Sequence, residues 1–484
     1  MKKLIPLILI ICLLLPSCQP SKTQFIAEST SANGSEEFTT AAEYSSFEES
    51  TAYDSTEAVT AAVLPSFTAN SITNTVSRVS STASVSKTAA LSVSAPASTR
   101  AATAAPKPAS PKTTAGTTKP AETQTELRGI WISCYDYISA AGKTRSEYKA
   151  ETDKMFKSIA DCGFNTAFVH MRAFSDAFYE SDIYPYSSFV AGTEGAPLPF
   201  DPFKVILESA KKYGISVHGW INPFRVSTKN DPSLLSASNP AKKILDGGNS
   251  EGEVCILKNG IYYNPACVSN HKLILDGVRE ILGKYDIDGI HIDDYFYPST
   301  DKSIDSKQYS QYKASGGALS LAEWRRASVN SFVSSLYSTV KATNSNLTVS
   351  ISPAAQIEKN KNELYADCAL WLSSKGYADI IIPQIYFGFE HETLDFQSLL
   401  AEWAALPRNP QIKLVCGLAA YKCGKNDAYA GAGSAEWQEN TDILARQLKC
   451  IRKNKNYSGF VVFSYKDLNR AACKTEIQNL KEAV

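Results

Sequence analysis

Apolar, β-branched runs alternate with amphipathic stretches from about residue 126 to the C-terminus. The apolar runs predict eight strands, at residues 127–135, 164–172, 215–224, 288–296, 347–355, 379–387, 413–421 and 457–465. Helical periodicity falls between them, at residues 146–162, 202–213, 271–285, 321–343, 394–405 and 436–453. Eight strand–helix units predict an α/β fold of the (β/α)8 TIM-barrel type. A doubly wound open sheet is the alternative, but no Gly-rich dinucleotide turn follows the first strand.

An insertion between the third and fourth strands carries a hairpin signal. Asn259-Gly260 lies between two short strand-like runs, and Asn-Gly is a preferred two-residue turn. With both residues in the turn, Cys255 is expected opposite Asn264 rather than Cys267. Because the insertion follows the C-terminal end of a strand, we expect it beside the barrel mouth.

The N-terminus has the pattern of an export signal. Lys2 and Lys3 precede an apolar run over residues 4–15, which is too short to span a bilayer and predicts a signal peptide. The following Leu15-Pro16-Ser17-Cys18 resembles the lipobox of bacterial lipoproteins. We therefore expect residues 1–17 to be a lipoprotein signal peptide and Cys18 to be lipidated, which would anchor the protein to the membrane outside the cytoplasm. A plain secretory signal, giving a secreted protein, is the alternative.

Residues 18–125 are rich in Ser, Thr, Ala and Pro. Such a segment cannot bury enough apolar surface to offset the entropy of ordering it, so it predicts a disordered linker. A flexible chain of about a hundred residues holds a domain roughly 50–60 Å from its anchor. The folded domain is expected at residues 126–484, at a distance that suits a substrate in the cell wall.

Charge and cysteine usage exclude several classes of function. The 49 Lys and Arg balance the 49 Asp and Glu, and no long basic run suggests nucleic acid as a partner. The folded part has an odd number of cysteines and no CxxC pair, so we expect mostly free, buried thiols. His170, His218 and His291 lie near the ends of adjacent strands, but no HxH or HExxH spacing supports a metal site. No cofactor is predicted, and neither a GxSxG motif nor a P-loop occurs.

The end of the fourth strand is the strongest candidate for chemistry. In TIM barrels the active site lies at the C-terminal ends of the strands. Side-chain alternation puts His291, Asp293 and Tyr295 on one face, and Asp294 follows at the strand end. A carboxyl crowded by apolar and aromatic groups has a raised pKa, as a general acid near neutral pH requires. Asp293 is therefore the first candidate for a catalytic acid.

Hydrolysis of a glycosidic bond usually takes two carboxyl groups, about 5–5.5 Å apart for retention or about 6.5–9.5 Å apart for inversion. The sequence leaves the second one open among Asp294, Asp176, Glu390 and Asp136. A substrate-assisted route, with an N-acetyl group as nucleophile, would need only one acid and a supporting residue.

Other strand ends supply groups that suit a sugar. Aromatic rings stack on the C–H faces of pyranoses, and polar side chains bind hydroxyl groups. The predicted substrate-binding residues are Arg172, His218, Trp220, Asn222, His291, Tyr295, Gln384 and Tyr386.

Several segments, in order along the folded part, resemble the glycosyl hydrolase-like 10 family: Leu127–Trp131, Pro199–Pro202, Val217–Arg225, Asp288–Pro298, Trp324–Arg326 and Ile382–Tyr386. The resemblance implies a TIM barrel related to glycoside hydrolases and, from characterised relatives, cleavage of peptidoglycan strands that lack stem peptides. The family's strand-four Asp pair falls on Asp293 and Asp294. Arg172 and Asp176 match its Arg and Gly-Asp loop, although Ser175 replaces the Gly.

The leading hypothesis is thus a surface-anchored glycoside hydrolase with a polysaccharide substrate, peptidoglycan glycan first. A hydrolase of another amino-sugar exopolysaccharide and a non-catalytic wall-binding lipoprotein are the alternatives. The sequence leaves the stereochemical outcome and the oligomeric state open.

Overall fold

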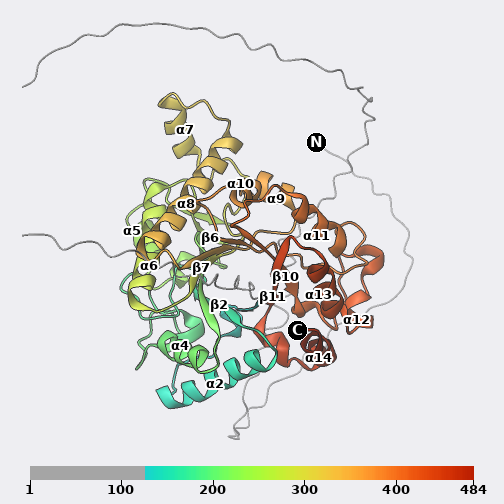
Figure 1. The fold of residues 1–484 in the computed structure, drawn as a ribbon. Helices are drawn as coiled ribbons and strands as arrows, with labels where there is room; N and C mark the ends of the chain where they lie inside the picture. The colour runs from blue at the N-terminus through green and yellow to red at the C-terminus, as the bar shows by residue number, and fades with distance from the viewer. Residues whose placement is uncertain (1–125) are drawn as a thin grey trace, which may run out of the picture. The chain divides into compact units, whose positions relative to one another are not determined.

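The computed structural model describes residues 126–484, which fold around a closed barrel of eight parallel strands (Figure 1). The (β/α)8 prediction is confirmed, and each predicted strand is present. Around the barrel the order is β1-β11-β10-β9-β8-β7-β3-β2. The strands are β1 (Leu127–Ile132), β2 (Thr166–Arg172), β3 (Ser216–Ile221), β7 (Gly289–Ile292), β8 (Thr348–Ile351), β9 (Ile380–Ile381), β10 (Lys413–Ala419) and β11 (Tyr457–Phe463).

Several strands are shorter than their apolar runs. The run at 288–296 gives only the four residues of β7, and the run at 379–387 gives only the two of β9. Asp293 follows β7 directly, outside the strand in which its run had placed it. Gln384 lies beyond β9 but still forms isolated parallel bridges to Ala354 and Gly417, so it stays in line with the barrel strands.

Amphipathic helices cover the outside of the barrel (Figure 1). They confirm the helical predictions to within a few residues, except that the stretch 436–453 is two helices interrupted at residues 440–442. Capping boxes at Thr144 and Ser320 begin two of the longest helices. The helices are α2 (Arg145–Asp161), α4 (Pro202–Lys212), α6 (Val268–Lys284), α8 (Leu321–Thr343), α11 (Phe396–Ala405), α12 (Glu436–Glu439), α13 (Ile443–Lys453) and α14 (Lys474–Ala483).

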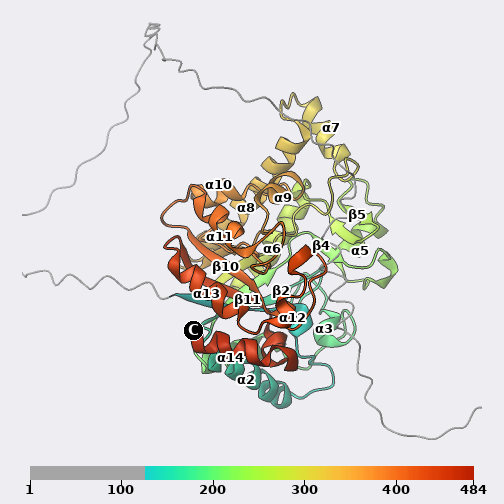
Figure 2. The same cartoon turned by 90° about the vertical axis from the view of Figure 1, so that its right-hand side faces the viewer.

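The insertion after β3 forms a small antiparallel sheet in the order β4-β6-β5. Its strands are β4 (Arg225–Ser227), β5 (Val254–Leu257) and β6 (Gly260–Tyr263). With α3 (Ser188–Ala191) and α5 (Pro240–Asp246), this sheet lies at one end of the barrel (Figure 2, right). That end carries the loops that follow the strands, as expected for the mouth.

The register of the hairpin differs from the prediction. Leu257 pairs with Gly260, so the turn is Lys258-Asn259, and Cys255 lies opposite Tyr262 instead of Asn264. Gly260 has a φ of +140°, and a Cβ there would approach the carbonyl oxygen of Ser227 to 2.3 Å. The glycine is therefore needed for the close approach of β4, not for the turn itself.

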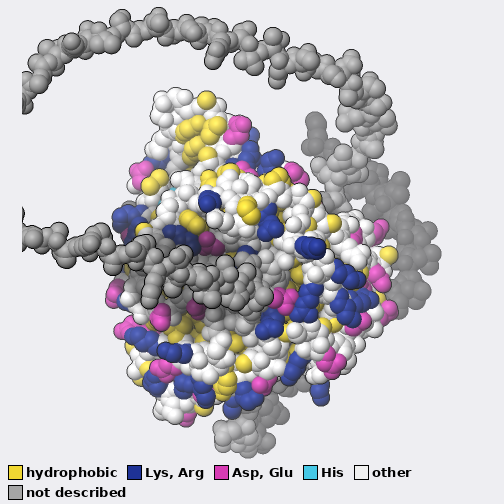
Figure 3. All heavy atoms as spheres, viewed as in Figure 1, with side chains coloured by type: hydrophobic (Ala, Val, Ile, Leu, Met, Phe, Trp, Pro, Cys, Tyr) yellow, Lys and Arg dark blue, Asp and Glu magenta, His cyan; other side chains and the backbone are white. Residues whose placement is uncertain are grey.

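The remaining helices lie in the strand-end loops. They are α7 (Ser306–Ala314), α9 (Ile357–Asn362) and α10 (Cys368–Ser373). The lobe that carries α7 projects from the barrel in both ribbon views, and hydrophobic side chains gather on it (Figures 1 to 3). Tyr309 and Tyr312 of α7 pack against each other and against Trp324 of α8.

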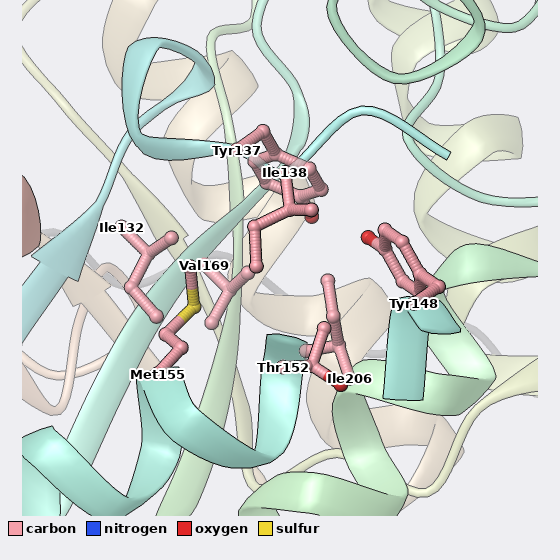
Figure 4. A pocket seen from close by; sticks show the side chains of 8 residues that line it. All are labelled: Ile132, Tyr137, Ile138, Tyr148, Thr152, Met155, Val169 and Ile206. Atoms are coloured by element: carbon pink, nitrogen blue, oxygen red, sulfur yellow. The ribbon is translucent and has the colours of Figure 1, made fainter. Parts of the chain in front are cut away.

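A narrow crevice lies between the barrel wall and the helices α2 and α4 (Figure 4). Its eight lining residues include Ile132 and Val169 from the strands and Tyr148, Met155 and Ile206 from the helices. It is too narrow to admit a water molecule, so it is a packing defect of the layer between strands and helices.

The nine cysteines between residues 134 and 473 are free thiols, and six of them are buried. No helix within residues 126–484 is long and apolar enough to cross a membrane. The predicted signal peptide at 1–17, Cys18 and the predicted linker at 18–125 lie outside the described residues.

Candidate active site

The end of β7 is built on a buried histidine. Trp131 Nε1 donates to His291 Nε2 at 3.0 Å, and Ser352 Oγ lies 3.1 Å from the same nitrogen. Nε2 is therefore an acceptor, and Nδ1 carries the proton toward Ser350 Oγ at 2.9 Å. Burial holds the pKa of His291 well below its usual range, so the ring is neutral. This network fixes the strand from which Asp293 projects.

Asp293 follows β7 directly, two residues after His291, and its carboxyl group lies close enough to Asp294 and Arg225 for both charges to act on it. Its side chain is buried and accepts one long hydrogen bond, from Tyr295 N at 3.4 Å. Burial and the neighbouring charge of Asp294 raise the pKa of Asp293 well above its usual range, against the opposing effect of Arg225. A buried carboxyl group with a raised pKa is suited to act as a general acid.

Asp294 lies beside Asp293 and is half-buried, and its anionic form is stabilised by more neighbouring groups than that of Asp293. Gln384 Nε2 donates to Asp294 Oδ1 at 3.3 Å and to the carbonyl of Ser352 at 2.9 Å. Burial raises the pKa of Asp294 as well, while this amide and the charges of Lys359 and Arg225 lower it. Since two adjacent carboxylates resist double ionisation, the pair shares its charge, with the proton on Asp293.

Four cations come from four different strand-end loops: the buried Arg225, and Lys359, Lys425 and Lys466. We call them the basic rim. Arg225, from β4, lies 4.1 Å from the ring centre of Tyr295 and acts on both carboxyls. Lys425 and Lys466 lie 5.9 and 5.8 Å from the rings of Tyr421 and Tyr135. The sequence gives no signal for this rim, because its members come together only through barrel closure.

The end of β3 contributes an ordered polar and aromatic cluster. The ring of Trp220 stacks on His170 with centroids 3.4 Å apart. Cys134 N donates to His170 Nδ1 at 2.9 Å, so Nε2 carries the proton and faces Asn222 Oδ1 at 3.4 Å. Burial lowers the pKa of His170 to about 3. Trp220 is buried, and its Nε1 has no hydrogen-bond partner among the described residues.

The wall opposite β7 is aromatic. Trp131, Tyr386, Tyr421 and Phe463 pack at centroid distances between 5.9 and 6.3 Å, mostly at steep angles. They come from the ends of β1, β9, β10 and β11. Trp131 and Phe463 are buried, whereas Tyr386 and Tyr421 are half-buried and keep ring surface on which a sugar can stack. We call these four residues the aromatic wall.

Three predicted substrate-binding residues lie below the mouth. Arg172 is 2% exposed, and its Nη1 donates to the carbonyls of Asn222 and Pro223 at 2.7 and 3.0 Å, so it holds the β3 loop. His218 is buried against Phe168, and burial lowers its pKa to about 4. His291 belongs to the network described above. These three side chains position the site, whereas Trp220, Asn222, Tyr295, Gln384 and Tyr386 lie at the mouth.

The other candidate carboxylates are engaged elsewhere. Asp136 accepts from Ser133 N and Oγ at 2.7 and 2.5 Å, from Ser464 Oγ at 2.9 Å and from Lys466 N at 2.8 Å. Asp176 is buried in its own loop and accepts from Phe174 N at 3.2 Å. Burial raises the pKa of Asp176 to about 6, although a hydrogen bond from Ser187 opposes the shift. Glu390 is exposed, so it lacks the enclosure of the Asp pair.

The histidines do not form a metal centre. Within residues 126–484, no group of three or more His, Cys, Asp or Glu side chains is arranged to hold a metal ion.

Comparison with known proteins identifies relatives of this chain. Residues 126–431 match the family model described as Glycosyl hydrolase-like 10. The chain is 30% identical over 371 residues to the glycosyl hydrolase YngK of Bacillus subtilis, covering 72% of this chain and 70% of that protein. It is 27% identical over 400 residues to the glycosyl hydrolase DigH of Escherichia coli, covering 74% and 88%. Among solved structures, the glycoside hydrolase domain of PgaB from Bordetella bronchiseptica aligns with a TM-score of 0.49 at 13% identity, covering 74% of this chain and 99% of that one.

Proposed function

The chain belongs to the glycosyl hydrolase-like 10 family, and we propose that it hydrolyses glycosidic bonds of a cell-wall glycan outside the cytoplasm, namely peptidoglycan strands that lack stem peptides. One observation carries the hydrolytic part of this proposal. A buried Asp293, whose pKa burial and the charge of Asp294 raise, lies beside an amide-supported Asp294 at the end of β7, across the barrel from the aromatic wall.

The basic rim favours an acidic glycan. When a stem peptide is removed from muramic acid, the lactyl group is left with a free carboxylate. Arg225, Lys359, Lys425 and Lys466 attract such a group, because cations around a concave site concentrate anionic ligands. A partly deacetylated poly-N-acetylglucosamine carries ammonium groups, which the rim repels. This charge difference separates the two candidate substrates.

The anchor is part of the same proposal. Lipidation of Cys18 and a linker over residues 18–125 would hold the barrel away from the membrane, within reach of the wall. Palmitate labelling of the wild type and of Cys18→Ser tests it: label on the wild type alone supports the anchor, and label on neither contradicts it.

A substrate panel tests the proposed activity. The purified full-length protein is incubated with amidase-treated glycan strands, intact peptidoglycan and partly deacetylated poly-N-acetylglucosamine, and the release of reducing ends is measured. We expect release from the amidase-treated strands. Release of reducing ends from the deacetylated polymer alone would show that the alternative glycan is the substrate. Binding to a glycan with no release of reducing ends from any of the three would show a non-catalytic wall-binding protein.

The rim is tested by a matched pair of variants. Lys466→Gln removes a rim charge, whereas Lys474→Gln removes an exposed charge at the start of α14. We expect Lys466→Gln to raise KM for the amidase-treated strands a few-fold, with a weaker dependence on salt, and Lys474→Gln to leave KM unchanged. Equal KM values for both variants and the wild type would remove the rim from substrate recognition.

A further inference from the structure

The two carboxylates of the site come from one wall of the barrel. Asp293 and Asp294 are consecutive at the end of β7, and β11 lies four places away in the ring of eight strands, directly across the mouth. When an enzyme supplies both an acid and a nucleophile or base, the two carboxyl groups flank the scissile bond. The second group should then come from the ends of β11, β1 or β10.

Each buried carboxylate on the loops of that opposite wall is committed to the fold, including Glu436 after β10, which accepts from Phe389 N and Glu390 N at 3.0 and 2.9 Å. Asp136, after β1, has its four donors from two loops. Asp467, after β11, accepts from Arg470 Nε at 2.9 Å and from Ser464 N at 3.4 Å. Asp427, after β10, binds Lys422 Nζ at 2.6 Å. Within residues 126–484, the wall that faces Asp293 therefore presents aromatic rings where a second catalytic carboxylate would be needed.

Asp176 is the remaining buried candidate, on the loop after β2. Ser187 Oγ accepts from Phe189 N at 3.3 Å to begin α3, which leaves its hydroxyl proton for Asp176. With Phe174 N as its other donor, Asp176 links the β2 loop to α3. It is thus an organiser of this loop.

On these grounds, and resting on the proposed function, we propose that catalysis is substrate-assisted: the nucleophile is the carbonyl oxygen of the 2-acetamido group on the sugar whose bond is cleaved, Asp293 is the general acid, and Asp294 binds the acetamido N–H. The substrate class is accordingly a glycan with an N-acetylated amino sugar at the cleaved position.

The steps balance without another reactant besides water. Asp293 gives its proton to the glycosidic oxygen, the bond from C1 to that oxygen breaks, and the acetamido oxygen bonds to C1 to form an oxazolinium ion. Asp294 stabilises the positive charge at nitrogen. Water then attacks C1 as Asp293 takes up one of its protons, the C1–acetamido oxygen bond breaks, and the acetamido group is restored with retained configuration.

The surroundings of the pair fit these roles. Gln384 bridges Asp294 and the carbonyl of Ser352, so the carboxylate that must orient the acetamido group is itself held in place. The unpartnered Nε1 of Trp220 is a buried donor available to a substrate oxygen.

A graded series of substrates tests the inference on the wild-type enzyme. Glycan strands are de-N-acetylated and re-acylated with acetyl, fluoroacetyl, difluoroacetyl or trifluoroacetyl groups, and kcat/KM is measured for each. Because fluorine withdraws electrons from the carbonyl oxygen, we expect kcat/KM to fall steeply along the series, by at least 100-fold from acetyl to trifluoroacetyl. A flat series with good activity would overturn the inference and leave the proposed function intact, whereas no activity on the acetyl strands would refute the proposed function.

A second arm uses variants and azide. Asp176→Asn should keep most of the wild-type rate on the acetyl strands. If Asp176→Asn or Asp294→Asn loses activity and azide restores it with formation of a glycosyl azide of inverted configuration, that carboxylate is the nucleophile and the inference is wrong.

Discussion

Asp293 and Asp136 are two buried aspartates at strand ends on opposite walls of the same barrel, with opposite surroundings. Asp136 has four donors from its own loop and from the loop after β11, whereas Asp293 has one long hydrogen bond and a charged neighbour. Both side chains are nearly inaccessible to solvent: Asp136 is 7% exposed and Asp293 is 2% exposed. Burial therefore does not identify a catalytic carboxyl group. Burial raises the pKa of both carboxyl groups, but at Asp136 the hydrogen bonds from Ser133 and Lys466 oppose the shift. The number of donors therefore separates the carboxyl group that is held in the fold from the one that is left available for proton transfer.

The largest expected effect is on activity at Asp293. Asp293→Asn removes the acid while keeping the size of the side chain, so kcat on amidase-treated strands should fall by roughly 10²–10⁴-fold. Because no strong hydrogen bond is lost, the Tm should remain close to that of the wild type. A near wild-type kcat in Asp293→Asn would contradict the role of Asp293 as the general acid, and with it the functional difference between the two aspartates.

The converse effect is expected at Asp136. Asp136→Asn leaves one oxygen and exchanges the other for an amide that faces the donors of Ser133, which should lower the free energy of unfolding by about 4 kcal/mol. Urea unfolding measures it. Asp161→Asn is the control, since Asp161 is an exposed partner of Lys157 on α2 and its loss should cost less than about 1 kcal/mol. Equal changes in both variants would contradict the structural role of Asp136.

Asp176 should affect the pH dependence of stability. Its pKa is raised to about 6 in the folded protein, so its contribution to stability is complete below pH about 4 and is lost as pH rises through about 6. Asp176→Asn cannot titrate and keeps an oxygen for Phe174 N. Its unfolding free energy relative to the wild type should therefore rise between pH 4 and pH 7, by up to about 3 kcal/mol. A constant difference over this range would show that Asp176 titrates normally.

The smallest effect is expected at the aromatic wall. Tyr386→Leu removes a ring that can stack on a sugar, which should raise KM about five-fold, or about 1 kcal/mol, with little change in kcat. Tyr309→Leu on α7, outside the site, is the control. If both variants leave KM unchanged, the wall packs the barrel and does not bind substrate.

The contrast between the two aspartates also shows how far the sequence could predict the site. Strand alternation was sufficient for the eight units and for the position of Asp293 at the end of the fourth strand, because both depend on local spacing; the catalytic role of Asp293 stays a prediction. The state of Asp136 was not predictable, since Ser464 and Lys466 are more than 300 residues away in sequence. Arg225 lies just beyond the third predicted strand, but only the β4-β6-β5 sheet brings it onto Tyr295.

The predictions of the hairpin register and of the last helix were wrong for different reasons. The turn rule assumed that glycine belongs in the turn, whereas Gly260 is required by the approach of Ser227. The prediction of one helix over residues 436–453 missed the break at residues 440–442, where Asn440 Nδ2 donates to the carbonyl of Glu436. Side-chain hydrogen bonds of this kind compete with helix continuation.

The most direct test of the central claim is the pH dependence of kcat/KM on amidase-treated strands, for the wild type and Asp294→Asn. If Asp293 is the acid and the Asp294 charge helps to hold its proton, the wild-type rate falls on an alkaline limb. That limb should move to lower pH in Asp294→Asn, even though the variant is slower overall. An alkaline limb at the same pH in both proteins would contradict the account, because the group that donates the proton would then not be the neighbour of Asp294.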